Sequence, residues 1–113
     1  MQSLLFNNLH IENEPVNIPL SDGITLTIKR EDKNHPFVSG NKLRKLKYNI
    51  AQAQQEGKDT ILTFGGAYSN HIAATAAAGQ IVGLKTIGVI RGDELGSKID
   101  VNPTLKFAKS CGM

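Results

Sequence analysis

Short strand-like segments alternate with helix-like segments through most of this 113-residue chain. Strand signals, which are short alternating or apolar runs with β-branched side chains, occur at residues 24–29, 60–64 and 86–90. Helix signals, which are apolar side chains three and four positions apart, capping residues or a closing glycine, occur at residues 41–55, 69–82 and 102–109. This alternation predicts an α/β fold with a parallel sheet and right-handed crossovers.

The segment at residues 86–90 bears on the number of layers. Its side chains are almost all apolar, which is typical of a strand buried on both faces of a sheet. We therefore expect a three-layer parallel-sheet unit and a single α/β segment over residues 1–113. Residues 1–20 are expected to be extended and irregular. The pattern ends where a further strand would follow, which indicates the N-terminal portion of a longer fold.

Composition narrows the classes of function. One cysteine cannot form an internal disulfide or a cysteine-based zinc site, which favours a reducing compartment, the cytoplasm. The three histidines are too dispersed to predict a metal site. A net charge of +3 is too small to indicate nucleic acid by itself. No apolar run approaches the roughly 20 residues of a membrane span, so no membrane partner is expected.

Lys42 is the basic residue nearest the apolar stripe of the predicted helix at residues 41–55. At about 100° per residue, it lies about 60° from the centre of the stripe. Lys47 lies at about 80°, Lys45 at about 120° and Arg44 at about 140° by the same geometry. The positive end of the helix dipole and the neighbouring cations are expected to lower the pKa of Lys42. A neutral amine suits Schiff-base chemistry, whereas the alternative interpretation is a solvated basic face.

A second candidate site follows the strand signal at residues 60–64. Two glycines, Gly65 and Gly66, precede a helix start at Ser69 or Asn70, an arrangement that receives anions well. The loop has neither the dinucleotide fingerprint nor the P-loop sequence, which disfavours nucleotide binding. An ordinary strand-to-helix turn remains the alternative. Tyr68, in the same loop, either packs within it or lines a site.

Three motifs together resemble one enzyme family. They are Lys-Arg-Glu-Asp at residues 29–32, Ser-Gly-Asn-Lys-x-Arg-Lys-Leu at residues 39–46, and Gly-Gly-x-x-Ser-Asn-His at residues 65–71. The combination resembles the 1-aminocyclopropane-1-carboxylate deaminase/D-cysteine desulfhydrase family. These are pyridoxal 5'-phosphate (PLP) enzymes with the tryptophan synthase β-like, fold type II architecture. The resemblance implies a PLP-dependent deaminase or lyase that acts on a small amino acid.

The resemblance also implies roles for individual residues. Lys42 would form the Schiff base with PLP and then act as a catalytic base. Asn70 would hydrogen-bond the phenolic oxygen of the cofactor. Ser69, Asn70 and His71 would receive the substrate carboxylate, and Ser69 would assist catalysis by proton transfer or attack. Tyr68 stands where family members often carry glutamine, which leaves the particular substrate open, and whether the whole protein forms a homodimer is also left open.

Two alternatives remain beside the enzymatic interpretation. In such enzymes the phosphate-gripping loop and the partner of the pyridine nitrogen lie later in the chain, so we expect these 113 residues alone to bind PLP weakly. The chain would then be a truncated, non-catalytic α/β fragment that associates with its remainder. A less favoured alternative is a basic module that binds phosphates or nucleic acid through Lys42, Arg44, Lys45 and Lys47.

Overall fold

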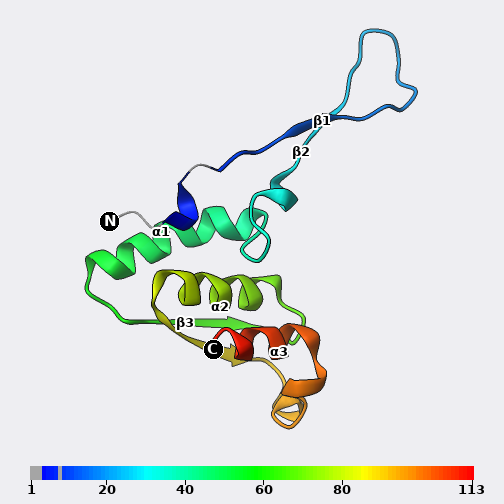
Figure 1. The fold of residues 1–113 in the computed structure, drawn as a ribbon. Coiled ribbons are helices and arrows are strands. Elements are labelled where there is room, and N and C mark those ends of the chain that lie inside the picture. The colour runs from blue at the N-terminus through cyan, green and yellow to red at the C-terminus, as the bar shows by residue number, and fades with distance from the viewer. Residues whose placement is uncertain (1–3, 8) are drawn as a thin grey trace.

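The centre of the fold is a pair of parallel strands packed against helices (Figure 1). The computed structural model describes residues 4–7 and 9–113. The strands are β3 (Thr60–Gly65) and β4 (Lys85–Ile90), paired from Thr60 opposite Lys85 to Gly65 opposite Ile90. The helices are α1 (Asn41–Gln55), α2 (Asn70–Val82) and α3 (Pro103–Ser110). The predicted parallel pairing and all three predicted helices are confirmed.

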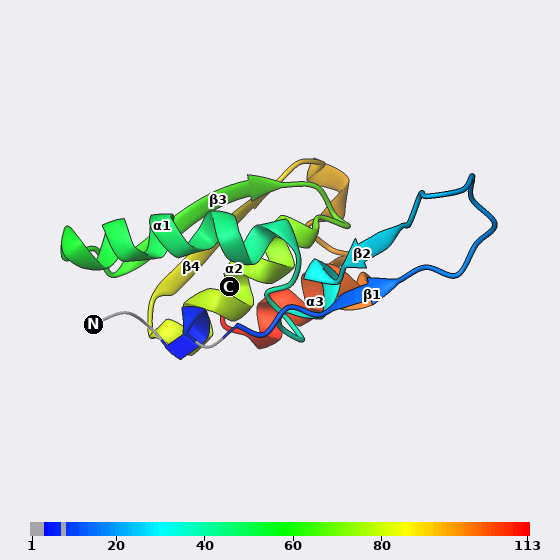
Figure 2. The same ribbon diagram turned by 90° about the horizontal axis from the view of Figure 1, so that it is seen from above.

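The first predicted strand is wrong in its extent and its partner. Of residues 24–29, only β2 (Thr27–Lys29) forms a strand, and it pairs antiparallel with β1 (Asn13–Pro15) in a separate sheet. Pairing with a segment nearby in sequence costs less loop-closure entropy than joining the distant parallel pair. The alternating apolar side chains of this segment therefore stay exposed. Figure 2 shows the two-stranded ribbon and its connecting loop extending away from the helices.

The start of the chain is more ordered than expected. The sequence predicts an extended, irregular segment over residues 1–20, but the short 3-10 turn η1 (Leu4–Phe6) places Leu5 in the core. The β1 strand also falls within this range. Residues 1–3 and 8 lie outside the described part of the chain. Burial of the Leu5 side chain explains why a segment without a periodic pattern is held against α2.

Helices cover one face of the parallel pair in the described residues. Thr63 and Thr86 point into this face and are buried. The opposite face carries apolar side chains that are 43–69% exposed, namely Leu62, Phe64, Ile87 and Val89. The expected three-layer arrangement is therefore not present in residues 4–7 and 9–113, which form two layers. An apolar strand predicts two covered faces, but the described residues supply helices for only one.

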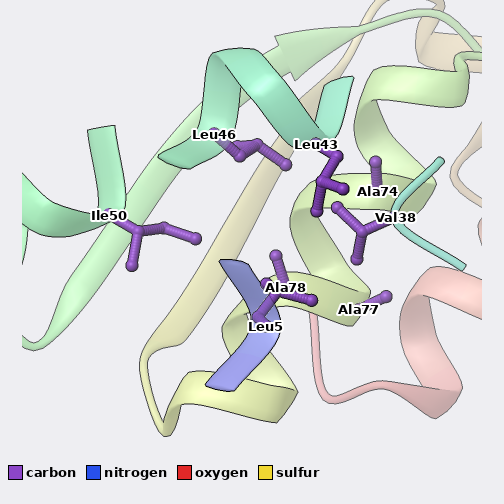
Figure 3. Packing of buried hydrophobic residues seen from close by; sticks show 8 residues of the cluster. All are labelled: Leu5, Val38, Leu43, Leu46, Ile50, Ala74, Ala77 and Ala78. Atoms are coloured by element: carbon purple, nitrogen blue, oxygen red, sulfur yellow. The ribbon is translucent and has the colours of Figure 1, made fainter. Parts of the chain in front are cut away.

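The main core lies between α1 and α2 (Figure 3). Leu43, Leu46 and Ile50 form the buried stripe of α1, as the periodicity predicts. They face a surface of α2 built from alanines, Ala74, Ala77 and Ala78, against which Val38 and Leu5 also pack. Small side chains on α2 allow the two helices to approach closely. This contact fixes where α1, and therefore its first turn, lies relative to α2.

We predict that shortening the α1 stripe destabilises the fold strongly. Leu43→Ala removes a side chain that is 0% exposed and should lower the free energy of unfolding by about 2–5 kcal/mol. Leu62→Ala is the matched control, because the same change is made where the side chain is 53% exposed. Urea denaturation measures both variants. Equal losses for the two would contradict the placement of the core.

Candidate functional site

The first turns of α1 and α2 lie at the same end of the molecule. Figures 1 and 2 both show the two helices running in the same direction, with their starts near the carboxyl ends of β3 and β4. Ligands of parallel α/β sheets bind outside the carboxyl ends of the strands. Lys42 is in the first turn of α1, and Asn70 and His71 are in the first turn of α2. The fold thus brings the two sequence motifs to one edge.

Lys42 lies toward the buried side of its helix. It is partly buried, as is Lys47, whereas Arg44 and Lys45 are exposed, the order that the helical periodicity predicts. Within residues 4–7 and 9–113, the ion pairs involve other basic residues, and no carboxylate pairs with the Lys42 ammonium. The amine is therefore held near the protein surface without being committed to a salt bridge.

The start of α1 is fixed by hydrogen bonds from the preceding loop. The Asn34 side chain makes two hydrogen bonds to the Gly40 backbone. Its Nδ2 atom donates to the Gly40 carbonyl at 3.2 Å, and its Oδ1 atom accepts from the Gly40 N–H at 3.1 Å. The Gly40 N–H also donates to the carbonyl of Glu31 at 3.0 Å. Gly40 has φ of 65°, a conformation that favours glycine. These hydrogen bonds also restrict the backbone position of Lys42, two residues later.

A bidentate ion pair ties the same loop to α1. Arg44 donates to both carboxylate oxygens of Glu31, at 2.9 and 2.7 Å. The Arg44 hydrogen bonds, aided by Lys29, lower the pKa of Glu31 to about 2, so the carboxylate stays ionised at neutral pH. Arg44, one of the basic residues considered for phosphate binding, therefore has an internal partner. That contact weakens the nucleic-acid interpretation.

The loop before α2 has space for a side chain at Gly66 but not at Gly65. A Cβ atom on Gly65 would lie 2.6 Å from Cγ1 of Ile72 and 2.9 Å from Oγ of Ser69, so a larger residue would displace the helix. A Cβ on Gly66 would meet nothing within 4 Å. Gly65 thus allows the strand to pass directly beneath the start of α2. Open space at Gly66 is compatible with a ligand close to the backbone.

Ser69 caps α2 with its side chain. Its Oγ accepts a hydrogen bond from the Ile72 N–H at 3.2 Å, and its backbone is extended, as an N-cap requires. The hydroxyl hydrogen of Ser69 is not used in this contact and can donate to another group. Asn70, the first helical residue, is exposed, and the exposed side chain of Tyr68 precedes the cap. The exposure of Tyr68 argues against packing within the loop.

His71 turns its imidazole toward β3. Its Nε2 lies 2.8 Å from Oγ1 of Thr63, which is buried. Burial lowers the pKa of His71 below its ordinary value, and the charges of Lys42 and Lys45 lower it further. The two lysine side chains are therefore close enough to act on the imidazole. His71 is neutral at pH 7 and links the two helix starts electrostatically.

Sequence reasoning did not single out Arg91. A depression of about 360 Å³ lies at the carboxyl ends of β3 and β4 and is lined by Phe64, Gly65, Gly66, Val89, Ile90 and Arg91. The Arg91 N–H donates to the carbonyl of Gly65 at 2.9 Å, which holds the residue beside the glycine loop. Its position directly after a parallel strand is the signal that could have identified it.

Within residues 4–7 and 9–113, no group of three or more His, Cys, Asp or Glu side chains is placed to hold a metal ion. No helix in that part of the chain has the length and apolarity needed to cross a membrane.

Comparison with known proteins identifies relatives that align with about two thirds of this chain. The chain is 41% identical over 80 residues to the bifunctional D-cysteine desulfhydrase/1-aminocyclopropane-1-carboxylate deaminase, mitochondrial, of Arabidopsis thaliana, covering 70% of the chain and 20% of that protein. It is 37% identical over 73 residues to a putative 1-aminocyclopropane-1-carboxylate deaminase of Pyrococcus abyssi, covering 65% and 22%. No family model matches.

A bacterial relative agrees with these two. The chain is 42% identical over 73 residues to the D-cysteine desulfhydrase of Salmonella paratyphi B, covering 63% of the chain and 22% of that protein. The resemblance noted from the three motifs is therefore confirmed. The chain spans about a fifth of the length of the relatives that it matches.

We predict that Ser69→Ala lowers the free energy of unfolding by about 1 kcal/mol, because an unpaired N–H is left at the start of α2. Ser69→Asp keeps an acceptor and should lose less. The control is Ser110→Ala, at an exposed serine whose hydroxyl donates to a carbonyl near the end of α3. Urea denaturation measures the three variants. A loss at Ser69 no larger than at Ser110 would argue against the cap.

We also predict a pH dependence that arises from His71. Its pKa is lowered in the folded chain, so below about pH 6.5 the unfolded chain binds a proton that the folded chain does not. The free energy of unfolding should therefore fall as the pH falls from about 6.5 toward the lowered pKa. Urea denaturation across this range should show a weaker dependence in His71→Gln. His35, whose pKa burial also lowers, contributes to the dependence that remains. An NMR midpoint for His71 at or above 6.5 would refute the prediction.

Proposed function

Since the chain is related in sequence to 1-aminocyclopropane-1-carboxylate deaminases and D-cysteine desulfhydrases, we propose that it supplies the Schiff-base lysine and the substrate carboxylate site of a PLP-dependent deaminase or lyase. The observation that carries the proposal is the position of Lys42. Lys42 is a partly buried residue, its ammonium has no carboxylate partner among the described residues, and its charge helps to lower the pKa of His71 in the first turn of α2.

The residues present fit one end of the cofactor. PLP carries an aldehyde, which reacts with primary amines, beside a phenolic oxygen, which accepts hydrogen bonds. Lys42 supplies the amine, and the exposed Asn70 side chain supplies an amide donor at the same edge of the fold. Open space at Gly66 leaves room for a ring next to the backbone. When bound, PLP supplies an electron sink for the bonds at the substrate Cα atom.

The first turn of α2 is suited to a substrate carboxylate. The unpaired N–H groups of a helix start and the positive end of the helix dipole both favour an anion. Asn70 and His71 add side chains there, and the Ser69 hydroxyl can still donate its hydrogen while its oxygen caps the helix. In this proposal the Ser69 hydroxyl moves a proton at the substrate, and Lys42 takes up or returns a proton at its Nζ atom.

The substrate class proposed is a small amino acid. The carboxylate site described above recognises the group that all amino acids share, so it does not distinguish between them. The relatives are named for 1-aminocyclopropane-1-carboxylate and D-cysteine, and both compounds carry the carboxylate that the proposed site would bind. The single cysteine remains the argument for the cytoplasm as a reducing compartment.

A second candidate function is a non-catalytic α/β segment that associates with further chain. The observation that favours it is the exposed apolar face formed by Leu62, Phe64, Ile87 and Val89. The two candidates differ in chemistry, because an association segment gives no reason for one lysine to react with PLP before the others. The following experiment therefore separates them.

We predict that PLP labels Lys42 selectively. The purified chain is incubated with PLP at less than one equivalent, reduced with borohydride, digested and mapped by mass spectrometry. The reduced pyridoxyl group should appear on Lys42 ahead of the other lysines, because Lys42 is in the first turn of α1, at the edge where Asn70 in the first turn of α2 offers the cofactor a second contact. Reduction captures an adduct even where equilibrium binding is weak.

Lys42→Arg and Lys45→Arg are the matched variants. Each keeps the positive charge and removes the reactive amine, one at the proposed site and one at an exposed position on the same helix. Lys42→Arg should abolish the selective label, and Lys45→Arg should leave it intact. Labelling spread evenly over exposed lysines such as Lys45 would reject the enzymatic proposal and favour the association segment.

A further inference from the structure

Thr63 contacts the candidate site from beneath. It lies within β3, its side chain faces the helices, and it is 8% exposed. Its Oγ1 atom lies 2.8 Å from Nε2 of His71, eight residues later in the chain. Among the described residues, His71 is the one hydrogen-bond partner of the Thr63 hydroxyl. Nothing in the motifs that identified Lys42 or Ser69 pointed to this residue.

The direction of this hydrogen bond follows from a count of protons. A buried hydroxyl that cannot donate its hydrogen pays the cost of an unmade hydrogen bond. If Nε2 of His71 carried a proton and donated it to Thr63, the Thr63 hydrogen would have no acceptor among the described residues. If Thr63 donates instead, its hydrogen is satisfied, and Nε2 must be unprotonated. Neutral imidazole then carries its proton on Nδ1.

We propose that Thr63 is a positioning residue, whose hydroxyl donates to Nε2 and holds neutral His71 in the tautomer that carries its proton on Nδ1.

This tautomer gives His71 a defined role at the start of α2. Its Nδ1–H has no partner among the described residues, so it is available as an uncharged hydrogen-bond donor in the first turn of α2. Burial and the nearby lysine charges keep the ring neutral, which is the condition under which the tautomer matters. The ligand class is a carboxylate, and assigning it to the amino-acid substrate rests on the proposed function.

The first experiment leaves Thr63 unchanged. The intact chain, labelled with 15N at histidine, is examined at neutral pH without PLP by two-dimensional NMR that correlates ring nitrogens with ring carbon-bound protons. Replacement of His71 by glutamine assigns its signals. The expected result is a protonated Nδ1 and an unprotonated Nε2 at His71. A protonated Nε2 would overturn the proposal directly.

Three threonine variants then test the cause. Thr63→Val replaces the hydroxyl by a methyl group of similar size, so the Nδ1–H tautomer should lose its dominance. Thr63→Ser restores a hydroxyl and should restore the tautomer. Thr75→Val is the matched control: Thr75 is 1% exposed, its hydroxyl has no partner among the described residues, and it lines the same cavity of about 340 Å³ as Thr63 and His71.

The results separate this inference from the proposed function. An unchanged tautomer in Thr63→Val, or an equal change in Thr75→Val, would overturn the role of Thr63 whatever PLP does. Because the NMR readout uses the chain without cofactor, it stands even if borohydride labelling fails to select Lys42. Conversely, selective labelling of Lys42 in wild type with a protonated Nε2 at His71 would retain the proposed function and reject this inference.

Discussion

The packing of one leucine-rich stripe against one alanine surface determines the rest of this structure. Leu43, Leu46 and Ile50 of α1 lie on Ala74, Ala77 and Ala78 of α2. Because the helices run in the same direction, the contact that stabilises the fold also sets their first turns at one edge. The position of Lys42 thus depends on the packing of Leu43, the next residue, and of Leu46, about one turn later, and the position of His71 depends on Ala74, about one turn later.

Polar contacts then refine what the apolar contact positions approximately. The Asn34 hydrogen bonds hold Gly40, just before Lys42, and the Glu31–Arg44 ion pair holds Arg44, just after it. On the other helix, the Ser69 cap and the Thr63–His71 contact act on the first turn of α2. Surface ion pairs alone contribute little free energy, so their importance here is to restrict geometry. Contacts within the chain therefore fix the first turns of α1 and α2 without the help of a ligand.

Sequence reasoning succeeded where a pattern is local. Helix periodicity located α1 and ranked Lys42 as nearer the buried side than Lys45 or Arg44, and the capping residues located the start of α2. Sequence reasoning failed to predict strand pairing, because several segments can pair with the same strand. The alternating residues 24–29 carry a sound strand signal, but which strand they pair with is decided by a neighbour, β1, whose own signal is weak.

The covered faces of a sheet cannot be predicted from one strand either. The apolar character of residues 86–90 indicates two covered faces, but only elements elsewhere in a chain can provide the cover. Thr63 and Arg91 were missed for a related reason, since their significance comes from side chains and strand ends that meet only in three dimensions. The proposed roles of the site residues themselves stay predictions.

The bare outer face of β3 and β4 has a consequence for handling this polypeptide. Each of the two strands has one edge with unpaired backbone groups in the described residues, and between those edges lie Leu62, Phe64, Ile87 and Val89. Such a surface can template cross-strand misassembly between molecules. Dilute samples and a short time in concentrated form would therefore favour monodisperse material over aggregates.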